Sequence, residues 1–523
     1  MSKYFKEKYD VIIIGASLAG LSAALTLLKE GYDVLVLEQH NLPGGVATSF
    51  VRSGVEIEAS LHEMMGIGTK ENPQFVRKFL EENDIYVDWI KLPMAYRYID
   101  KEINVLVHFG EEGDFSVPAK EIAEACLDKN NEVFNKLMAF FQVCKENFEA
   151  MSYLTSHKLS NLETIKRFPN FVKTLGYSYL EVAKGMGLPQ KAIDILSGYW
   201  IYLGSPTNDL PFSIYSYILT GYLGYGSYIP RHTSYEMSVK LLNKVESLGA
   251  QVEFAQKVSK ILVKNNEVEG VKLKNGEIIY SKNVIAGPYP NTVFLKMIEP
   301  KEEIPEKALK WVNSMELGIS CFSITMLLDQ SYQELGLVDY ATFYAPNGLH
   351  IEKTFKDSYS LNNWDFLTCI SINTAHEDAS PKGTCLYTIT YLPKGESFLG
   401  VTKENYEDYK QKNIDYFLDE ESKRLGIDLR KHIIDMVVET PITISHYTDA
   451  YFGNIYGYQH KMNNHVVARN QQAKDEHFIK GLAFAGAHQV SGDGMAPAFS
   501  NGVRAALEIL EYNDRKDQKR DEN

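Results

Sequence analysis

The sequence is poor in the features that mark several specialised protein classes. Its five cysteines are scattered and form no C-x-x-C pair, which fits reduced thiols better than a disulfide framework or a zinc site. No His, Cys, Asp and Glu cluster shows metal-ligand spacing, so we expect no metal. No uncharged apolar run reaches the roughly 18 residues that span a membrane. The net charge of −14 disfavours nucleic acid as a partner, since phosphate binding requires a basic face.

What is present indicates a globular protein. Of its 523 residues, 45% are hydrophobic and 23% are charged. This length exceeds what one hydrophobic core usually supports, so we expect two domains. The first apolar run follows three lysines but lacks the small-residue cleavage site of a signal peptide, and we expect a cytoplasmic location.

An unusual richness in tyrosine marks residues 198–204 and 211–229. Two interpretations remain open. Aromatic side chains with a polar tip suit contact with a membrane surface or a long apolar pocket. The alternative is a packed helical core in which the tyrosines bond to one another.

The start of the chain has a dinucleotide-binding pattern. The apolar run from Val11 predicts a buried strand that stops at Gly15, where a helical pattern begins. Gly15 permits a tight turn, Gly20 permits close packing of helix and strand, and the helix N-terminus offers N–H groups to a pyrophosphate. Ser17 replaces the middle glycine, and its hydroxyl is suited to donate to a phosphate. Glu38 ends a second strand about 20 residues on, where a ribose-binding carboxylate is expected.

A second glycine-rich loop lies near the other end of the chain. The pattern predicts a strand over residues 482–485, a loop containing Gly486, Asp493 and Gly494, and a helix from about Pro497. A ligand held by both ends of the chain must be long, which favours FAD over NAD. No second G-x-G-x-x-G on a strand and helix is evident, so electrons need an external carrier or do not leave.

Patterns along the rest of the chain predict an α/β fold, α+β overall. Helical periodicity dominates residues 110–215, and short strands with a hairpin signal at Asn275-Gly276 follow residue 251. We expect a Rossmann-type FAD-binding domain with a parallel sheet, and an inserted substrate domain of mixed sheet and helices. The predicted cofactor-domain segments are 1–105, 228–290 and 475–523. The insertions are a helical and aromatic segment, 106–227, and a segment of sheet and helices, 291–474.

With these motifs in view, the chain resembles the phytoene desaturase, carotenoid isomerase and retinol saturase group within the amine-oxidase-like FAD superfamily. Further matches are the glycine doublet Gly44-Gly45, residues 54–62 against the family's G-Y-x-F-D-x-G-x-H stretch, and Tyr228-x-Pro-Arg231. The resemblance implies FAD as the cofactor. The residues that it implies at the cofactor are Gly15, Ser17, Leu18, Ala19, Gly20, Glu38, Gln39, Gly44, Gly45, Val46, Ala47, His62, Val258, Gly486, Asp493, Gly494 and Met495.

The chain also departs from this family pattern. Val46 stands where many relatives have an arginine near the pyrophosphate, Glu58 replaces an aspartate and Ser60 a glycine. FAD binding is compatible with these changes, whereas the substrate is not specified by the sequence.

Three polar residues are the candidates for catalysis. His62 and Glu63 follow the stretch expected to face the flavin, and either could protonate a carbon. Arg231 could anchor a carboxylate or the edge of the flavin ring. Each has a structural alternative: a satisfied histidine, a solvated carboxylate and an ion-pair partner.

We expect an enzyme that acts on carbon–carbon bonds of a long lipophilic substrate, a polyene or an unsaturated fatty acid, by saturation, desaturation or isomerisation. A flavin amine oxidase is an alternative, although no aromatic cage beside a lysine is evident. A non-catalytic flavin-binding lipid carrier is the other.

Overall fold

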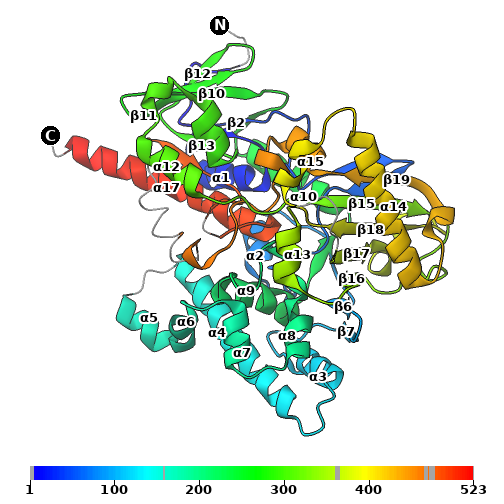
Figure 1. Ribbon diagram of the computed structural model, residues 1–523. Helices are drawn as coiled ribbons and strands as arrows, with labels where there is room; N and C mark the ends of the chain where they lie inside the picture. Colours follow the sequence, from blue (N-terminus) through cyan, green and yellow to red (C-terminus); the bar gives the residue numbers. More distant parts are fainter. Residues whose placement is uncertain are drawn as a thin grey trace.

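The computed structural model of the chain describes residues 5–156, 160–359, 365–464, 469, 478–489 and 491–521. Two sheet-containing regions and a layer of helices make up this part of the chain (Figure 1). Helices α3 to α9 lie together at the bottom of the view, and α17, close to the C-terminal end, extends to the left.

A parallel five-stranded sheet forms the centre of the first region. In spatial order its strands are β20 (Leu482–Phe484), β13 (Val284–Ala286), β1 (Val11–Ile14), β2 (Val34–Leu37) and β9 (Gln251–Glu253). All four pairings are parallel. The apolar residues of β1 and β2 are buried, as expected for strands covered on both faces.

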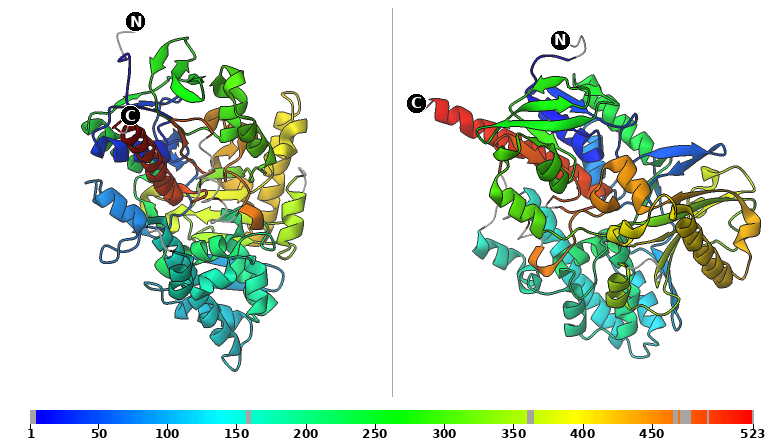
Figure 2. Two further views of the ribbon diagram at one scale, coloured as in Figure 1. Left: turned by 90° about the vertical axis from the view of Figure 1, so that its left-hand side faces the viewer. Right: turned by 45° about the horizontal axis from the view of Figure 1, so that its top comes forward.

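Three helices from distant parts of the sequence pack on one another beside this sheet. They are α1 (Leu18–Lys29), α10 (Thr233–Ser247) and α17 (Met495–Asp521). Helix α1 contacts both of the others, and the long α17 runs past it and out of the domain (Figure 2). The first and last helices of the described chain are therefore neighbours, as the predicted cofactor domain requires.

A four-stranded sheet adjoins the parallel one. It contains β12 (Ile278–Tyr280), β11 (Glu267–Leu273), β10 (Val258–Lys264) and β14 (Ile298–Glu299). Asn265 and Asn266 connect β10 to β11 with φ angles of 54° and 59°, the backbone that a two-residue type I′ hairpin turn needs. The hairpin predicted at Asn275-Gly276 is confirmed by the antiparallel pairing of β11 with β12. β14 shows that residues predicted to begin the second insertion still pack on this sheet.

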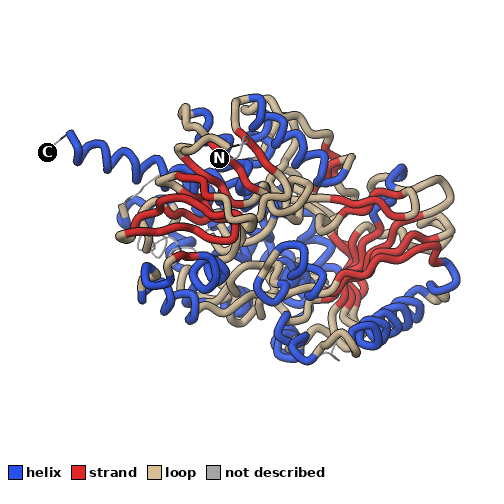
Figure 3. Tube along the Cα trace, turned by 90° about the horizontal axis from the view of Figure 1, so that it is seen from above, coloured by secondary structure: helices blue, strands red, loops and turns tan. Residues whose placement is uncertain are grey.

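The second region is built on a mixed seven-stranded sheet. Its order is β19 (Ile433–Glu439), β15 (Phe322–Leu328), β18 (Cys385–Tyr391), β17 (Leu367–Ser371), β16 (Ala341–Tyr344), β6 (Tyr96–Ile99) and β7 (Asn104–Val107). Only β16 and β6 pair in parallel. Helix α14 (Tyr406–Leu425) packs Ile414, Phe417 and Leu418 on one face (Figure 3).

This topology shifts one predicted domain boundary. The segment 1–105 was expected to belong to the cofactor domain, but β6 and β7 extend the other sheet. The reason is the long-range pairing of β6 with β16, which no local pattern reveals. The remaining division of the chain into segments stays a prediction.

The helical layer has a core rich in aromatic residues. Its helices are α3 (Ser116–Ala125), α4 (Glu132–Ser156), α5 (Asn161–Arg167), α6 (Pro169–Thr174), α7 (Tyr179–Gly185), α8 (Gln190–Leu196) and α9 (Phe212–Leu219). The remaining elements are α2 (Phe75–Glu81), α11 (Pro290–Thr292), α12 (Glu306–Ser314), α13 (Ile351–Asp357), α15 (Pro441–Thr448), β3 (Ser49–Arg52), β4 (Val55–Glu58), β5 (Trp89–Lys91) and β8 (Tyr228–Pro230). Within the described ranges, every helix is too short or too polar to cross a bilayer.

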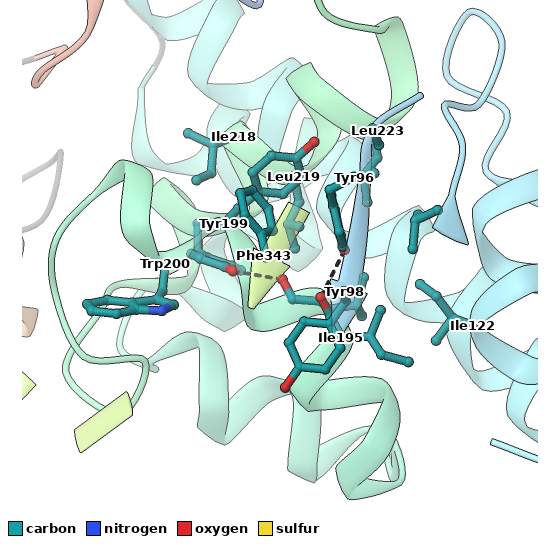
Figure 4. Packing of buried hydrophobic residues seen from close by; sticks show 14 of the residues in the cluster. Tyr96, Tyr98, Ile122, Ile195, Tyr199, Trp200, Ile218, Leu219, Leu223 and Phe343 are labelled. Carbon is teal, nitrogen blue, oxygen red and sulfur yellow. Dashed lines mark hydrogen bonds between the residues drawn. The ribbon is translucent and has the colours of Figure 1, made fainter. Parts of the chain in front are cut away.

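Buried tyrosines complete the C-terminal end of α8. The hydroxyl groups of Tyr179, Tyr96 and Tyr215 donate to the backbone carbonyls of residues 193, 195 and 196, at 3.2, 2.9 and 2.7 Å. The last carbonyls of a helix have few partners within it, and these hydroxyls add hydrogen bonds there; Figure 4 shows the bond from Tyr96 to Ile195. Much of the tyrosine-rich stretch is therefore packed core, and its Tyr215 bonds to a carbonyl rather than to another tyrosine.

Candidate active site

The N-terminal motif folds into the expected strand, turn and helix. Gly15 has a φ of 105°, a conformation that glycine adopts without strain. A Cβ on Gly20 would lie 2.0 Å from the Gly15 carbonyl oxygen, which confirms that this position requires glycine for close packing. Ser17 is the N-cap of α1, and its hydroxyl accepts from the Gly20 N–H at 3.3 Å.

Glu38 follows β2 and lies against this turn. Its carboxylate oxygens accept from the backbone N–H groups of Ala16 at 2.7 Å and His40 at 2.8 Å. The Gly44 N–H in turn donates to the Ala16 carbonyl at 2.8 Å. The side chain is 8% exposed, so the carboxylate is fixed in place beside the dinucleotide-binding turn.

One large cavity joins the two glycine-rich loops. Its volume is about 1830 Å³, well above the roughly 300–1,000 Å³ of most small-molecule sites. Of the residues predicted at the cofactor, it is lined by Gly15, Ser17, Leu18, Ala19, Glu38, Gln39, Gly44, Gly45, Val46, Ala47, His62, Val258, Gly486, Asp493, Gly494 and Met495. Gly20 is absent from the lining because it packs against Gly15. The loops from the two ends of the chain thus share a single cleft.

The far section of the cavity has an apolar and aromatic wall. Ile214, Tyr217, Ile218, Tyr222 and Tyr225 from the tyrosine-rich stretch line it. The rings of Tyr217 and Tyr225 stack on Phe148 of α4, with centroids 4.7 and 5.4 Å away. The tyrosine-rich stretch therefore lines an apolar pocket as well as forming packed core, so both interpretations of it apply in part.

Glu63 is a buried carboxyl on the cavity wall. Its Oε1 accepts a 2.5 Å hydrogen bond from the hydroxyl of Tyr202, which also lines the cavity. Its Oε2 is buried without a partner at hydrogen-bond geometry among the described residues. Burial raises the pKa of Glu63 to about 7, against the opposing effect of hydroxyls nearby. The group can therefore hold a proton near neutral pH.

His62 precedes it and also lines the cavity. Burial lowers the pKa of its ring to about 4, so the ring is neutral at physiological pH. Its backbone carbonyl accepts a hydrogen bond from the hydroxyl of Tyr340 on the neighbouring region. His62 and Glu63 thus face the same cavity, His62 as a neutral base and Glu63 as a carboxyl.

Asp493 in the C-terminal loop pairs with a histidine that the sequence did not reveal. Its carboxylate lies 2.6 Å from Nε2 of His460, and both side chains are buried. Burial and the nearby Arg469 lower the pKa of His460, whereas Asp493 raises it. Both residues line the cavity. His460 lies outside any motif, so only its position in the fold identifies it.

Arg231 does not share this cavity. It lines a separate pocket of about 490 Å³, and its Nε donates to Asp88 at 2.6 Å with the side chain 42% exposed. The predicted contact with flavin or substrate does not fit this placement; the ion-pair alternative does. Tyr202 lines the cavity instead of Arg231. The only signal for Tyr202 in the sequence was the richness in tyrosine around it.

Comparison with known proteins adds to this geometry. A family model described as an NAD(P)-binding Rossmann-like domain matches residues 13–82. The all-trans-retinol 13,14-reductase of Rattus norvegicus is 25% identical over 63% of this chain and 56% of its own length. The chloroplastic prolycopene isomerase of Daucus carota is 24% identical over 84% of this chain and 70% of its own. The 1-hydroxycarotenoid 3,4-desaturase of a Flavobacterium is 25% identical over 85% and 88%.

The chain is a homologue of these enzymes. Among solved structures, a putrescine oxidase bound to putrescine superposes with a TM-score of 0.61 at 14% identity, covering 96% of this chain and 99% of that one. This likeness concerns the fold alone, and the Rossmann-like family model together with the parallel sheet confirms the predicted Rossmann-type region. The resemblance drawn from the glycine-rich loops is confirmed by the curated homologues.

Proposed function

We propose that the chain is an FAD-dependent oxidoreductase that acts on carbon–carbon bonds of a long lipophilic substrate, such as a polyene. The observation that carries this proposal is the continuity of one cavity from the dinucleotide-binding turn to an aromatic wall. The names of the homologues, a reductase of retinol, an isomerase of prolycopene and a desaturase of a carotenoid, support the same substrate class.

The residues present fit FAD. Two helices begin at the cavity, α1 after Ser17 and α17 at Met495, and their N-terminal N–H groups suit oxygen-rich ligands. No acidic side chain occupies the first turn of either helix. A Cβ on Gly45 would lie 3.2 Å from the Ser17 Cβ, so the turns approach closely. We assign Glu38 to the ribose.

The other assignments follow the family resemblance, and the residues that they concern line the cavity. Gly44 and Gly45 would hold the pyrophosphate, the backbone at Val258 the adenine, and Gly486 and Asp493 the flavin end. When bound, the flavin supplies hydride or electron transfer at a carbon–carbon bond.

The side chains of this protein orient the substrate and move a proton. Glu63 keeps its proton up to about neutral pH and is placed to donate it, or to take one, through Oε2. Tyr202 fixes the other carboxylate oxygen. The wall built around Phe148 and Tyr217 excludes water from the apolar substrate. Electrons for a net reduction or oxidation come from or pass to an external carrier.

A flavin amine oxidase is supported only by likeness of fold, and the curated homologues favour the polyene reading. A non-catalytic lipid carrier would not need a carboxyl on the cavity wall whose pKa is raised to about 7.

The test is anaerobic reduction of the bound flavin, followed by all-trans polyene substrates and product analysis by mass. The purified protein should show the absorption of oxidised flavin. A two-unit gain in mass indicates saturation, a two-unit loss under oxidising conditions indicates desaturation, and an isomer of equal mass indicates isomerisation. A protein that cannot be loaded with FAD, or whose flavin no polyene affects, contradicts the proposal.

A further inference from the structure

Four polar side chains cross the seven-stranded sheet in one line. Ser323 on β15 lies directly opposite Glu439 on β19 and Thr390 on β18, and Thr390 lies opposite Thr368 on β17. All four residues line the large cavity. We call Glu439, Ser323, Thr390 and Thr368 the polar row.

The register places the polar row on one face. Residues directly opposite one another on neighbouring strands share a side of the sheet. With strands about 4.8 Å apart, four strands carry the row across about 14 Å. On the next strand, Phe343 lies opposite Thr368, and its ring packs against Tyr202 with centroids 6.0 Å apart. The Thr368 end of the row therefore lies beside Phe343, and Phe343 packs on Tyr202, the residue that bonds to Glu63.

The two ends of the polar row lack partners. Thr368 is 2% exposed, and its Oγ1 is buried without a hydrogen bond among the described residues. No described residue donates a hydrogen bond to the carboxylate of Glu439. Ser323 and Thr390 bond to each other at 2.8 Å, yet each hydroxyl oxygen can accept another bond. Buried polar groups in native proteins are generally bonded, so the unpaired hydroxyl of Thr368 indicates a ligand, and the half-buried Glu439 adds a carboxyl at the other end.

The next pair along the same strands provides a comparison. Thr325 and Thr388 also lie opposite each other and bond at 3.0 Å. Their neighbours across the sheet are the apolar Val437 and Ile370, and neither threonine lines the cavity. This pair therefore has apolar neighbours and lies away from the cavity, whereas the polar row continues over four strands and lines it.

The charge of the polar row limits the kind of ligand. Burial and the nearby carboxyl of Glu58 raise the pKa of Glu439 to about 7, and no member of the row is a cation. A carboxylate ligand would meet a partly negative, unneutralised surface. A hydroxyl group can both donate to Glu439 and exchange hydrogen bonds with the threonine hydroxyls.

We propose that the polar row binds the hydroxyl group of an otherwise apolar substrate, and that the site selects alcohols over the matching carboxylic acids. This inference rests on the proposed function only in that a lipophilic substrate occupies the cavity. It adds the recognition of one polar end, which the apolar wall around Tyr217 cannot supply.

The test compares three probes that share one polyene chain: all-trans-retinol, its methyl ether and retinoic acid. Each is titrated into the purified flavin-containing protein at pH 8 in the dark, and dissociation constants are read from quenching of protein fluorescence. The alcohol should bind about fivefold more tightly than the ether, the effect of one or two neutral hydrogen bonds. Equal binding of alcohol and ether overturns the inference.

Two variants test whether the polar row causes the preference for the alcohol. Thr368→Val keeps the side-chain shape and should weaken retinol binding about fivefold while leaving the ether unchanged. The matched control is Thr342→Val on β16, also buried but outside the cavity lining, which should change neither. Glu439→Gln should strengthen the binding of retinoic acid about fivefold relative to that of retinol.

The outcomes also separate the two proposals. Tight binding of all three probes without preference, or equal weakening of retinol and ether in Thr368→Val, overturns the polar row and leaves the proposed function intact. A protein that carries flavin but binds none of the probes contradicts both.

Discussion

The hydroxyl group of Tyr202 donates a 2.5 Å hydrogen bond to the carboxylate of Glu63, across 139 residues of sequence. Tyr202 comes from the helical layer, and Glu63 lies between β4 and α2. The bond therefore joins the helical layer to the region that carries the glycine-rich turn. Because both residues line the cavity, a change at either one should alter chemistry rather than cofactor retention.

Replacing Glu63 by Gln should lower kcat by about 100-fold, the usual contribution of a positioned general acid. Flavin content should stay at the parental level, since Glu63 is not among the residues assigned to FAD. Anaerobic single-turnover assays with the substrate identified by mass would measure the loss. Parental turnover in this variant would remove Glu63 from the mechanism.

Replacing Tyr202 by Phe should change the pH dependence of kcat. The parent needs protonated Glu63, so kcat should fall as pH rises through about 7. The Tyr202 hydroxyl lowers the pKa of Glu63, so its removal should move the falling limb of the kcat–pH profile to higher pH. Tyr199→Phe is the matched control, because its buried hydroxyl has no hydrogen-bond partner among the described residues. A limb that stays fixed in Tyr202→Phe would contradict the assignment.

The raised pKa of Glu63 also predicts how stability depends on pH. A carboxyl whose pKa is about 7 when folded and 4.5 otherwise favours folding at low pH. This contribution is lost as pH rises from about 4.5 through 7. Glu63→Gln should therefore gain stability relative to the parent between pH 5 and pH 8, measured as the difference in denaturant midpoints. A constant difference across this range would show that the carboxyl is not perturbed.

Gly20→Ala should destabilise the cofactor region and reduce its flavin content. The new Cβ would overlap the Gly15 carbonyl oxygen, and overpacking of this kind costs about 1–3 kcal/mol or more. Gly185→Ala in α7 is the control: a Cβ there meets no atom within 4 Å. It should stabilise its helix by up to about 1 kcal/mol. Thermal unfolding and flavin absorbance would report both effects, and full flavin content in Gly20→Ala would refute the packing argument.

Tyr215→Phe should lower Tm, because the carbonyl of Leu196 loses its 2.7 Å hydrogen bond inside the core. The loss of one buried hydrogen bond costs about 0.5–1.5 kcal/mol. Tyr199→Phe again serves as the comparison, since it removes a hydroxyl that makes no hydrogen bond. A Tm loss of equal size in the two variants would show that the ring positions, and not the bond to α8, matter.

The dinucleotide-binding end of the site could be predicted because its determinants are local. Gly15, Gly20 and Glu38 act within one strand–helix–strand unit, where sequence spacing translates directly into geometry. The hairpin at Asn265 and Asn266 is of the same kind, since a two-residue turn is encoded in two residues. The C-terminal loop could be joined to this unit only through the resemblance and the length of the expected cofactor.

The rest of the site depends on contacts between distant segments. His460 lies in no motif, and only the fold brings it to Asp493. Arg231 matched a family pattern, but Asp88, which is 143 residues away in the sequence, holds it in a different pocket. The pairing of β6 with β16 likewise required strands far apart in sequence to meet. Patterns of a few residues carry no information about such pairings.

The contact between α1 and α17 has a consequence for biosynthesis. The ribosome releases the dinucleotide-binding turn long before the segment around Gly494. The cleft to which we assign FAD needs both loops, so it is complete only after the segment around Gly494 has emerged and packed against α1.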